Sequence, residues 1–227
     1  MNVLEGAWFT LQGLLSGVFS ADWFAVAMKF FPFVALFELP VQATVMLGAL
    51  RHHLTRDPRA NQVPYAPTVS CIILCYSEGE AVVQTVRSLT EQLYSGHIEL
   101  LAILDGSQQN ADTYEVLKKL LPYVNGRSDR KLIVVPKKQR GGRVSSLNQG
   151  LAIATGEIVL ALDGDTSFDN DMVRAVAVRF ADPNVAAVSG NLRVRNAKQS
   201  LTTRLQALEY MLSIHLSRTG LAQFNII

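Results

Sequence analysis

One stretch limits what this chain can fold into: an apolar run that ends in two closely spaced carboxylates. It spans residues 158–166 and reads Ile-Val-Leu-Ala-Leu-Asp-Gly-Asp-Thr. A continuous apolar run of this length is typical of a strand buried on both faces, as in a parallel sheet. Asp163 and Asp165 then follow the carboxyl end of that strand, where open α/β sheets bind their ligands.

The two aspartates either bind a ligand or form a plain acidic turn. Side by side they repel each other, but a divalent cation makes them useful together, because Mg²⁺ and Mn²⁺ prefer hard oxygen ligands. Gly164 between them lets the backbone turn sharply and a ligand approach closely. Since Asp and Gly are also common turn residues, this motif alone supports the two interpretations about equally.

The composition argues against nucleic-acid binding. Of the 227 residues 49% are hydrophobic and 18% are charged, and the net charge is only +2. This charge gives no electrostatic support for a nucleic-acid partner, and none is expected. Cys71 and Cys75 would lie on one face of a strand about 13 Å apart, too far for a disulfide. We expect buried thiols in a reducing compartment rather than a metal site.

The N-terminal part is predicted to enter a membrane. Residues 30–50 carry a single charge, Glu38, and a helix of this length crosses a bilayer core. Because a charge at mid-membrane costs about 2.5–3.5 kcal/mol, Glu38 is expected to face another helix or to lie off centre. The alternative is a buried helix of a soluble protein, although the segment is long for one. Residues 6–21 are either a first span, which would give a hairpin, or an interfacial helix.

Basic side chains follow this span directly: Arg51, His52, His53, Arg56 and Arg59. Such a cluster marks the cytoplasmic side, so the rest of the chain is expected in the cytoplasm, at the cell membrane or, in a bacterium, the inner membrane. Three prolines in residues 57–67 predict a linker. The expected organisation is a membrane segment at 1–56, the linker, and an α/β domain at 68–227.

Strands and helices are predicted to alternate through that domain. Strands are expected at 69–75, 98–104, 132–135, 158–163 and 185–189. Apolar spacing predicts helices over 81–93, 112–121, 144–154 (with Gly156 as its C-cap) and 171–180. This alternation indicates βαβ units and a mostly parallel sheet flanked by helices. A last amphipathic helix is predicted over 200–217, packed on the sheet or along the membrane surface.

Polar loops follow three of these strands, at residues 76–78, 105–107 and 163–166. In a parallel sheet the three strand ends face the same way, so we expect the loops to form one cleft. A basic turn, residues 139–143 with the sequence Gln-Arg-Gly-Gly-Arg, begins a predicted helix. Two guanidiniums beside a helix N-terminus suit a diphosphate. An acidic metal site together with a basic anion cradle is what a sugar-nucleotide site requires.

These motifs resemble those of family 2 glycosyltransferases with the GT-A fold, of the membrane-embedded type that includes hyaluronan, chitin, poly-N-acetylglucosamine and cellulose synthases. The matching stretches are 69–78 (Val-Ser-Cys-Ile-Ile-Leu-Cys-Tyr-Ser-Glu), 104–107 (Leu-Asp-Gly-Ser), 141–150 (Gly-Gly-Arg-Val-Ser-Ser-Leu-Asn-Gln-Gly) and 162–165 (Leu-Asp-Gly-Asp). The resemblance covers about residues 67–227 and is specific as a set of motifs. It implies a GT-A (Rossmann-like) domain, incomplete at its C-terminus.

The resemblance also implies residues that hold the base and ribose of a UDP-sugar: Tyr76, Glu78 and Asp105. Two positions depart from the family pattern. Ser77 replaces the usual Asn, and Leu104 replaces the first Asp of the common Asp-Asp-Gly-Ser. The second departure leaves one carboxylate to hold the base.

A second set of residues is implied for the diphosphate and the metal. Arg143 stands where the family has Lys or Arg near the nucleotide, and Asp163 would lie near the ribose and diphosphate. Asp165, with Asp163, would bind Mg²⁺ or Mn²⁺. The family's general base, an aspartate on the acceptor side, is expected beyond Ile227, so no catalytic base is assigned.

The sequence leaves three functions to be compared. The favoured one is an inverting transferase that passes a sugar from a UDP-sugar to a polysaccharide or lipid acceptor at the membrane. The alternative is a non-catalytic, membrane-anchored nucleotide-sugar-binding subunit or a truncated fragment, for which a C-terminal half or second subunit is the expected partner. A dinucleotide-binding domain is not supported, because no Gly-x-Gly-x-x-Gly follows the first predicted strand.

Overall fold

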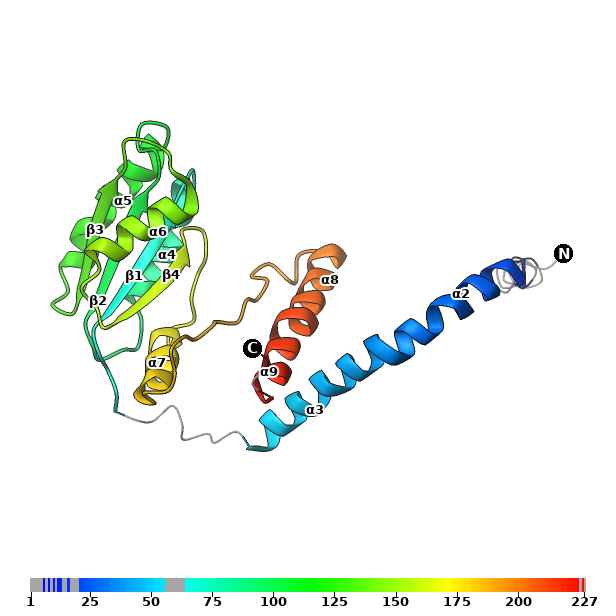
Figure 1. Cartoon of the computed structure of the whole chain (residues 1–227). Helices are drawn as coiled ribbons and strands as arrows, with labels where there is room; N and C mark the ends of the chain where they lie inside the picture. The colour runs from blue at the N-terminus through cyan, green and yellow to red at the C-terminus, as the bar shows by residue number, and fades with distance from the viewer. Residues whose placement is uncertain are drawn as a thin grey trace. The chain divides into compact units, whose positions relative to one another are not determined.

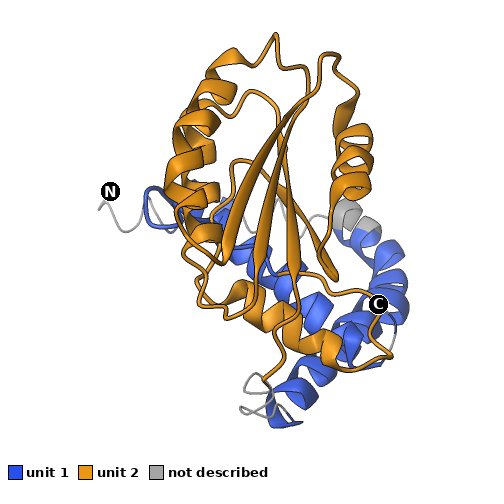
Figure 2. Cartoon of the chain, turned by 90° about the vertical axis from the view of Figure 1, so that its left-hand side faces the viewer, with its two compact units in different colours: residues 1–57, 191–227 blue, residues 58–190 orange. Residues whose placement is uncertain are grey.

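The structure is a computed structural model that describes residues 21–55, 64–224 and 226, together with 6, 8, 10, 12, 13 and 16. Most of the predicted first membrane segment (6–21) and of the linker (57–67), with Arg56 and Arg59, lies outside the described residues. The chain divides into two compact units, Met1–Asp57 with Asn191–Ile227, and Pro58–Gly190 (Figure 2). Residues 191–227, which the sequence analysis placed in the α/β domain, thus group with the N-terminal helices.

The unit Pro58–Gly190 contains a four-stranded sheet with the strand order β3-β2-β1-β4 (Figure 1). Its strands are β1 (Val69–Cys75), β2 (Ile98–Leu104), β3 (Arg130–Pro136) and β4 (Ile158–Asp163). Every pair of neighbouring strands is parallel. The predicted α/β fold class, with a mostly parallel sheet flanked by helices, is therefore confirmed.

The buried centre of this sheet is formed by β1 and β2, whose residues are all buried. Strand β4 pairs with β1 and, within the described residues, has no second strand beside it. Buried and more exposed positions therefore alternate along β4. The prediction that 158–163 is buried on both faces is wrong, because an apolar run does not reveal which neighbours cover the strand.

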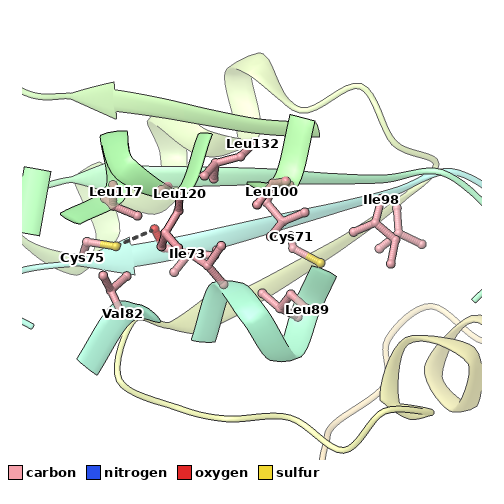
Figure 3. Close-up of a cluster of buried hydrophobic side chains, with 14 of the residues drawn as sticks. Cys71, Ile73, Cys75, Val82, Leu89, Ile98, Leu100, Leu117, Leu120 and Leu132 are labelled. Carbon is pink, nitrogen blue, oxygen red and sulfur yellow. Dashed lines mark hydrogen bonds between the residues drawn. The ribbon is translucent and has the colours of Figure 1, made fainter. Parts of the chain in front are cut away.

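Helices cover both faces of the sheet. They are α4 (Val82–Thr90, after the 3₁₀ turn η3 at Gly79–Ala81), α5 (Ala111–Asn125), α6 (Gly142–Ile153) and α7 (Met172–Ala177, followed by η4 at Val178–Ala181). Apolar residues of α4 and α5 pack on one face, and α6 packs on the other (Figure 1). Figure 3 shows the larger core, where Cys71 and Cys75 lie among aliphatic side chains. Both cysteines are buried free thiols, and burial raises the pKa of Cys71 to about 12.

Helix α6 packs on the sheet through small residues. Val144 and Leu151, predicted to mark its apolar face, are 71% and 56% exposed, whereas Ser146 and Gly150 are buried. A Cβ atom at Gly150 would collide with the side chain of Ile72 on β1. Close approach of the helix backbone to the sheet thus decides which face of α6 is buried.

Two further local predictions are wrong. Helix α6 is capped by Ala154 in an extended conformation, not by Gly156. Gly156 instead lies against the backbone of Ser70, where a Cβ atom would have no room. Residues 185–189 are described and form no strand.

The other unit consists of two helical runs. The first comprises α2 (Ala21–Phe33), a π-helical stretch η1 (Val34–Glu38) and α3 (Leu39–Thr55); the second comprises α8 (Leu201–Tyr210), η5 (Met211–Leu216) and α9 (Ser217–Ala222). The stretch η1 follows Pro32, which has no N–H to donate to the helical ladder. The part Ala27–Thr55 is long and apolar enough to cross a bilayer.

Within this unit α3 and α9 meet backbone to backbone. Gly48 and Gly220 are both buried, and a Cβ atom on either would collide with the backbone of the other helix. The Arg51 guanidinium donates a hydrogen bond to the Gln223 carbonyl at 3.3 Å. The second helical run therefore packs on α3 through α9, which lies beyond the helix predicted over 200–217.

Candidate functional site

The loops at the carboxyl edge of the sheet enclose one pocket of about 310 Å³. The six residues proposed from the sequence all line it: Tyr76, Glu78, Asp105, Arg143, Asp163 and Asp165. Arg140 and Ser146 also line it. Parallel strands bring these loops together, as expected, since their carboxyl ends share one edge.

The loop after β1 has an unusual backbone conformation. Ser77 has a φ of 64° and Gly79 a φ of 53°, both in the left-handed region. The Gly79 amide donates a hydrogen bond to Thr113 Oγ1 at 2.9 Å, which ties the loop to α5. Asn tolerates the left-handed region better than Ser does. The position where Ser77 replaces the family's usual Asn is therefore one at which the backbone is strained.

Glu78 carries a buried carboxylate oxygen, Oε2, that has no hydrogen-bond partner. Burial raises the pKa of Glu78; hydrogen bonds to backbone groups oppose this rise, and the charges of Asp165 and Asp163 add to it. A buried polar atom without a partner calls for an explanation. A donor or cation supplied by a ligand would satisfy it.

Tyr76 and Arg140 connect the β1 loop to the basic turn. The guanidinium carbon of Arg140 lies 3.9 Å from the centroid of the Tyr76 ring, a cation–π contact. Arg140 is one of the two guanidiniums of the basic turn that the sequence suggested for a diphosphate, but no individual role was predicted for it.

Asp105 ties the basic turn to the edge of the sheet. Its Oδ1 accepts hydrogen bonds from Lys137 Nζ at 2.6 Å and from the Gly141 amide at 2.8 Å, and its Oδ2 accepts one from the Gly142 amide at 2.8 Å. Burial opposes ionisation, but these donors outweigh it and lower the pKa of Asp105 to about 2. The helix N-terminus predicted to cradle a diphosphate thus already holds an anion, the Asp105 carboxylate.

Lys137 belongs to this network, and the sequence analysis missed it. Its ammonium also donates to Ser145 Oγ at 3.1 Å and to Ser146 Oγ at 3.0 Å. A usable signal was present, because Lys137 directly follows β3 as Asp105 follows β2. Loops after parallel strands meet at one edge, so the residue after β3 is expected beside the residues that follow β1, β2 and β4.

The two aspartates after β4 differ in their surroundings. Asp163 forms an ion pair with Arg143, and both side chains are more than half exposed. Asp165 accepts a hydrogen bond from Thr166 Oγ1 at 3.3 Å and forms no ion pair with any described residue. An exposed ion pair contributes only about 0–1 kcal/mol, so a ligand can displace it easily.

Gly164, between these aspartates, is held from two sides. Its amide donates to the Leu74 carbonyl of β1 at 3.0 Å, and its carbonyl accepts from Thr85 Oγ1 of α4 at 2.8 Å. A Cβ atom there would lie 2.9 Å from the Leu74 oxygen, which leaves room only for glycine. Strand β1 and helix α4 therefore fix the backbone from which both carboxylates project.

These carboxylates fit a divalent cation that is shared with a phosphate. Mg²⁺ is usually bound by one or two carboxylates together with substrate phosphate oxygens. Asp163 and Asp165 supply that number of hard oxygen ligands. Among the described residues no group of three or more His, Cys, Asp or Glu side chains is arranged to hold a metal.

Comparison with known proteins establishes the family. Residues 70–225 match the model of glycosyl transferase family 2. The chain belongs to this family. Its membership confirms the resemblance that the sequence motifs indicated.

Two curated proteins show which members of family 2 the chain is similar to. Poly-beta-1,6-N-acetyl-D-glucosamine synthase of Staphylococcus aureus (strain COL) is 28% identical over 191 residues, 81% of this chain and 44% of the synthase. N-acetylglucosaminyltransferase of Azorhizobium caulinodans is 28% identical over 167 residues, 73% of this chain and 41% of that protein. The first of these relatives is a polysaccharide synthase, the type that the sequence motifs resemble. The chain spans less than half the length of either relative.

A solved structure with partial similarity is a mannosyltransferase of Pyrobaculum calidifontis in complex with GDP-Man and Mn²⁺. It aligns with a TM-score of 0.46 and 23% identity, over 70% of this chain and 47% of the mannosyltransferase.

Proposed function

We propose that this family 2 chain forms the donor-binding part of a membrane-bound glycosyltransferase that uses a UDP-sugar. The observation that carries the proposal is the single pocket lined by all six residues assigned from the sequence. These residues come from the loops after β1, β2 and β4 and from the start of α6. Aromatic, cationic and carboxylate groups are thus combined in one place.

The pocket offers different chemistry to each part of the donor. Tyr76 supplies an exposed ring for the nucleobase, and the Oε2 atom of Glu78, which has no partner, is suited to accept from a ribose hydroxyl. Arg143 and Arg140 supply guanidiniums, which bind phosphate oxygens in bidentate fashion. In the proposed complex Arg143 leaves its ion pair with Asp163 and binds a phosphate instead. The Asp163 carboxylate is then free.

Asp165 and Asp163 are the proposed ligands of Mg²⁺ or Mn²⁺. When bound, such an ion neutralises the charge that develops on the leaving diphosphate. Leu74 and Thr85 keep both aspartates at the pocket edge through their bonds to Gly164. The backbone that carries the two carboxylates is therefore held by its neighbours.

Transfer is proposed to proceed by direct attack of an acceptor hydroxyl on the anomeric carbon, with inversion. The acceptor is proposed to be a growing polysaccharide or a lipid. A positioned base contributes about 10²–10⁴-fold to such a step, and none of the described residues is assigned that role.

The location at a membrane, with the α/β unit in the cytoplasm, is part of the same proposal. The apolar helix Ala27–Thr55 supports it, as do Arg51, His52 and His53 near the end of that helix. Exposed apolar side chains on α8 and η5 add support: Leu201, Leu205, Leu208, Met211 and Leu212.

Asp165→Ala tests the metal and donor assignment. In the full chain purified in detergent, we expect Mn²⁺ to strengthen UDP binding, measured by isothermal titration calorimetry, and this gain to disappear in the variant. Asp169→Ala is the matched control, because Asp169 is an exposed carboxylate of the same loop outside the pocket. A Mn²⁺ dependence that is the same in Asp165→Ala as in the wild type would refute the assignment.

A donor screen tests the substrate class. UDP-glucose, UDP-GlcNAc and UDP-glucuronate should compete with UDP for the pocket, whereas GDP-mannose should compete poorly. Equal competition by GDP-mannose would contradict the choice of a uridine nucleotide.

A further inference from the structure

Lys137 is a nearly buried cation whose hydrogen bonds are all made within the protein. Its side chain is 10% exposed, and its ammonium has three acceptors: one oxygen of Asp105 and the hydroxyls of Ser145 and Ser146. A lysine has three N–H donors and no acceptor. The ammonium therefore has no donor left for a ligand, and Lys137 is not among the residues that line the pocket.

Asp105, the acidic partner of Lys137, caps helix α6 from the loop after β2. Helix α6 begins after Gly141, a residue with no side chain to cap it. Asp105 takes that place, because its two oxygens accept from the amides of Gly141 and Gly142. A carboxylate at this point also interacts favourably with the positive end of the helix dipole.

This cap fixes the part of the basic turn that lies between the two pocket arginines. Arg140 directly precedes the capped glycines and stacks on Tyr76. Arg143 directly follows them and pairs with Asp163. Holding the two glycine amides therefore limits where both guanidiniums can lie.

The turn also requires glycine at both capped positions. Gly142 has a φ of 77°, in the left-handed region. A Cβ atom at Gly141 would lie 2.8 Å from Ser145 Cβ and 3.0 Å from Lys137 Nζ. The backbone is thus packed directly onto the lysine, and loss of that ammonium would leave the Asp105 carboxylate buried without a countercharge.

We propose that Lys137 is a positioning residue of the nucleotide site: it holds Asp105 and, through that carboxylate, the turn that presents the two pocket arginines. That the site binds a nucleotide rests on the function proposed above, whereas the positioning of the basic turn by Lys137 does not. Lys137 acts on the donor only through the basic turn and does not touch it.

The first test needs no ligand. Hydrogen exchange of the Gly141 and Gly142 amides is measured by NMR on the full chain in detergent, for the wild type, Lys137→Met and Lys138→Met. We expect exchange on the order of tenfold faster in Lys137→Met, as for loss of the support of a charged hydrogen bond. Lys138→Met should match the wild type, since Lys138 is the exposed neighbour outside the network. Unchanged exchange in Lys137→Met would overturn the proposal.

The second test is a double-mutant cycle on UDP affinity in the presence of Mn²⁺. Lys137→Met should weaken UDP binding by about tenfold, and Asp105→Asn should weaken it as well. The double variant should bind no more weakly than Asp105→Asn alone, because Lys137 acts through Asp105. Multiplied losses would show that the lysine contacts the nucleotide itself and would overturn the positioning role.

The double variant also keeps the test decisive if Lys137→Met alone does not fold. It removes both charges together, so no buried charge is left without a partner. Its glycine amides should exchange faster than those of the wild type, and equal exchange would overturn the proposal. If the wild type binds no UDP while Lys137→Met still speeds exchange, the proposed function fails and the positioning role stands.

Discussion

At the scale of single residues, the charged groups of the pocket mostly satisfy one another. Asp105 is held by Lys137 and two backbone amides, and Asp163 is paired with Arg143. Two carboxylates are less engaged: Glu78 has a buried oxygen without a partner, and Asp165 has no ion pair with a described residue. The pocket therefore has a rigid part around Asp105 and an open part that suits a cation.

The lowered pKa of Asp105 predicts a pH-dependent contribution to stability. Its folded-state pKa of about 2 lies below the ordinary 3.8, so the ionised carboxylate stabilises the fold above pH 3.8. That contribution is lost as the pH falls through about 2. Asp105→Asn should therefore lower the thermal midpoint at pH 7, and the difference from the wild type should shrink below pH 3.8.

Circular dichroism of the full chain in detergent measures this difference across the pH range. Asp169→Asn serves as the control, because Asp169 is an exposed carboxylate outside the Asp105 network. A difference between Asp105→Asn and the wild type that stays constant down to pH 2 would contradict the stabilising role of the ionised carboxylate.

At the scale of elements, glycines decide how closely the helices pack. Gly150 lets α6 approach Ile72 of β1, and Gly164 fits against the Leu74 carbonyl. Gly48 and Gly220 bring the backbones of α3 and α9 into contact. Small residues at helix contacts are typical of helices that associate in membranes, where close backbone approach replaces hydrophobic burial.

Gly220→Leu should separate α9 from α3. The new side chain would overlap the α3 backbone at Val45, and overpacking of this kind typically costs about 1–3 kcal/mol. We expect faster hydrogen–deuterium exchange over 217–222, measured by mass spectrometry on the full chain. Ala222→Leu is the matched control, because Ala222 is an exposed residue of the same helix, and equal protection in both variants would argue against the contact.

At the scale of the whole molecule, the chain separates into a unit built on a buried sheet and a unit of helices with many exposed apolar side chains. Strands β1 and β2 give the unit Pro58–Gly190 its own core. The helical unit exposes large apolar residues along both of its runs, including Phe30, Leu36, Leu47, Leu205 and Met211. Exposed apolar surface of this extent indicates a contact with lipid or protein.

This division predicts different behaviour for two fragments. Residues 58–190 should fold alone and stay in the soluble fraction after ultracentrifugation. A chain that lacks 1–57 but keeps 191–227 should still sediment with membranes, because α8, η5 and α9 retain their exposed apolar residues. If that second chain is soluble, the N-terminal helices alone account for membrane attachment.

The amino-acid sequence by itself determined the local elements and most of the pocket. The predicted strands 69–75 and 98–104 match β1 and β2, because a short apolar run bounded by turn signals is typical of a buried strand. The alternation of strands and helices predicted a parallel sheet, whose strands share one carboxyl edge. It therefore also placed Tyr76, Asp105 and Asp163 together.

Only the tertiary structure decided which surfaces meet. It placed β4 at the edge of the sheet, buried α6 through Gly150 rather than Val144, and paired Lys137 with Asp105. Each of these contacts joins residues far apart in the chain, and long-range packing sets its geometry. A periodic pattern records what a segment prefers locally, but the neighbour that covers it depends on how the remaining elements close around the core.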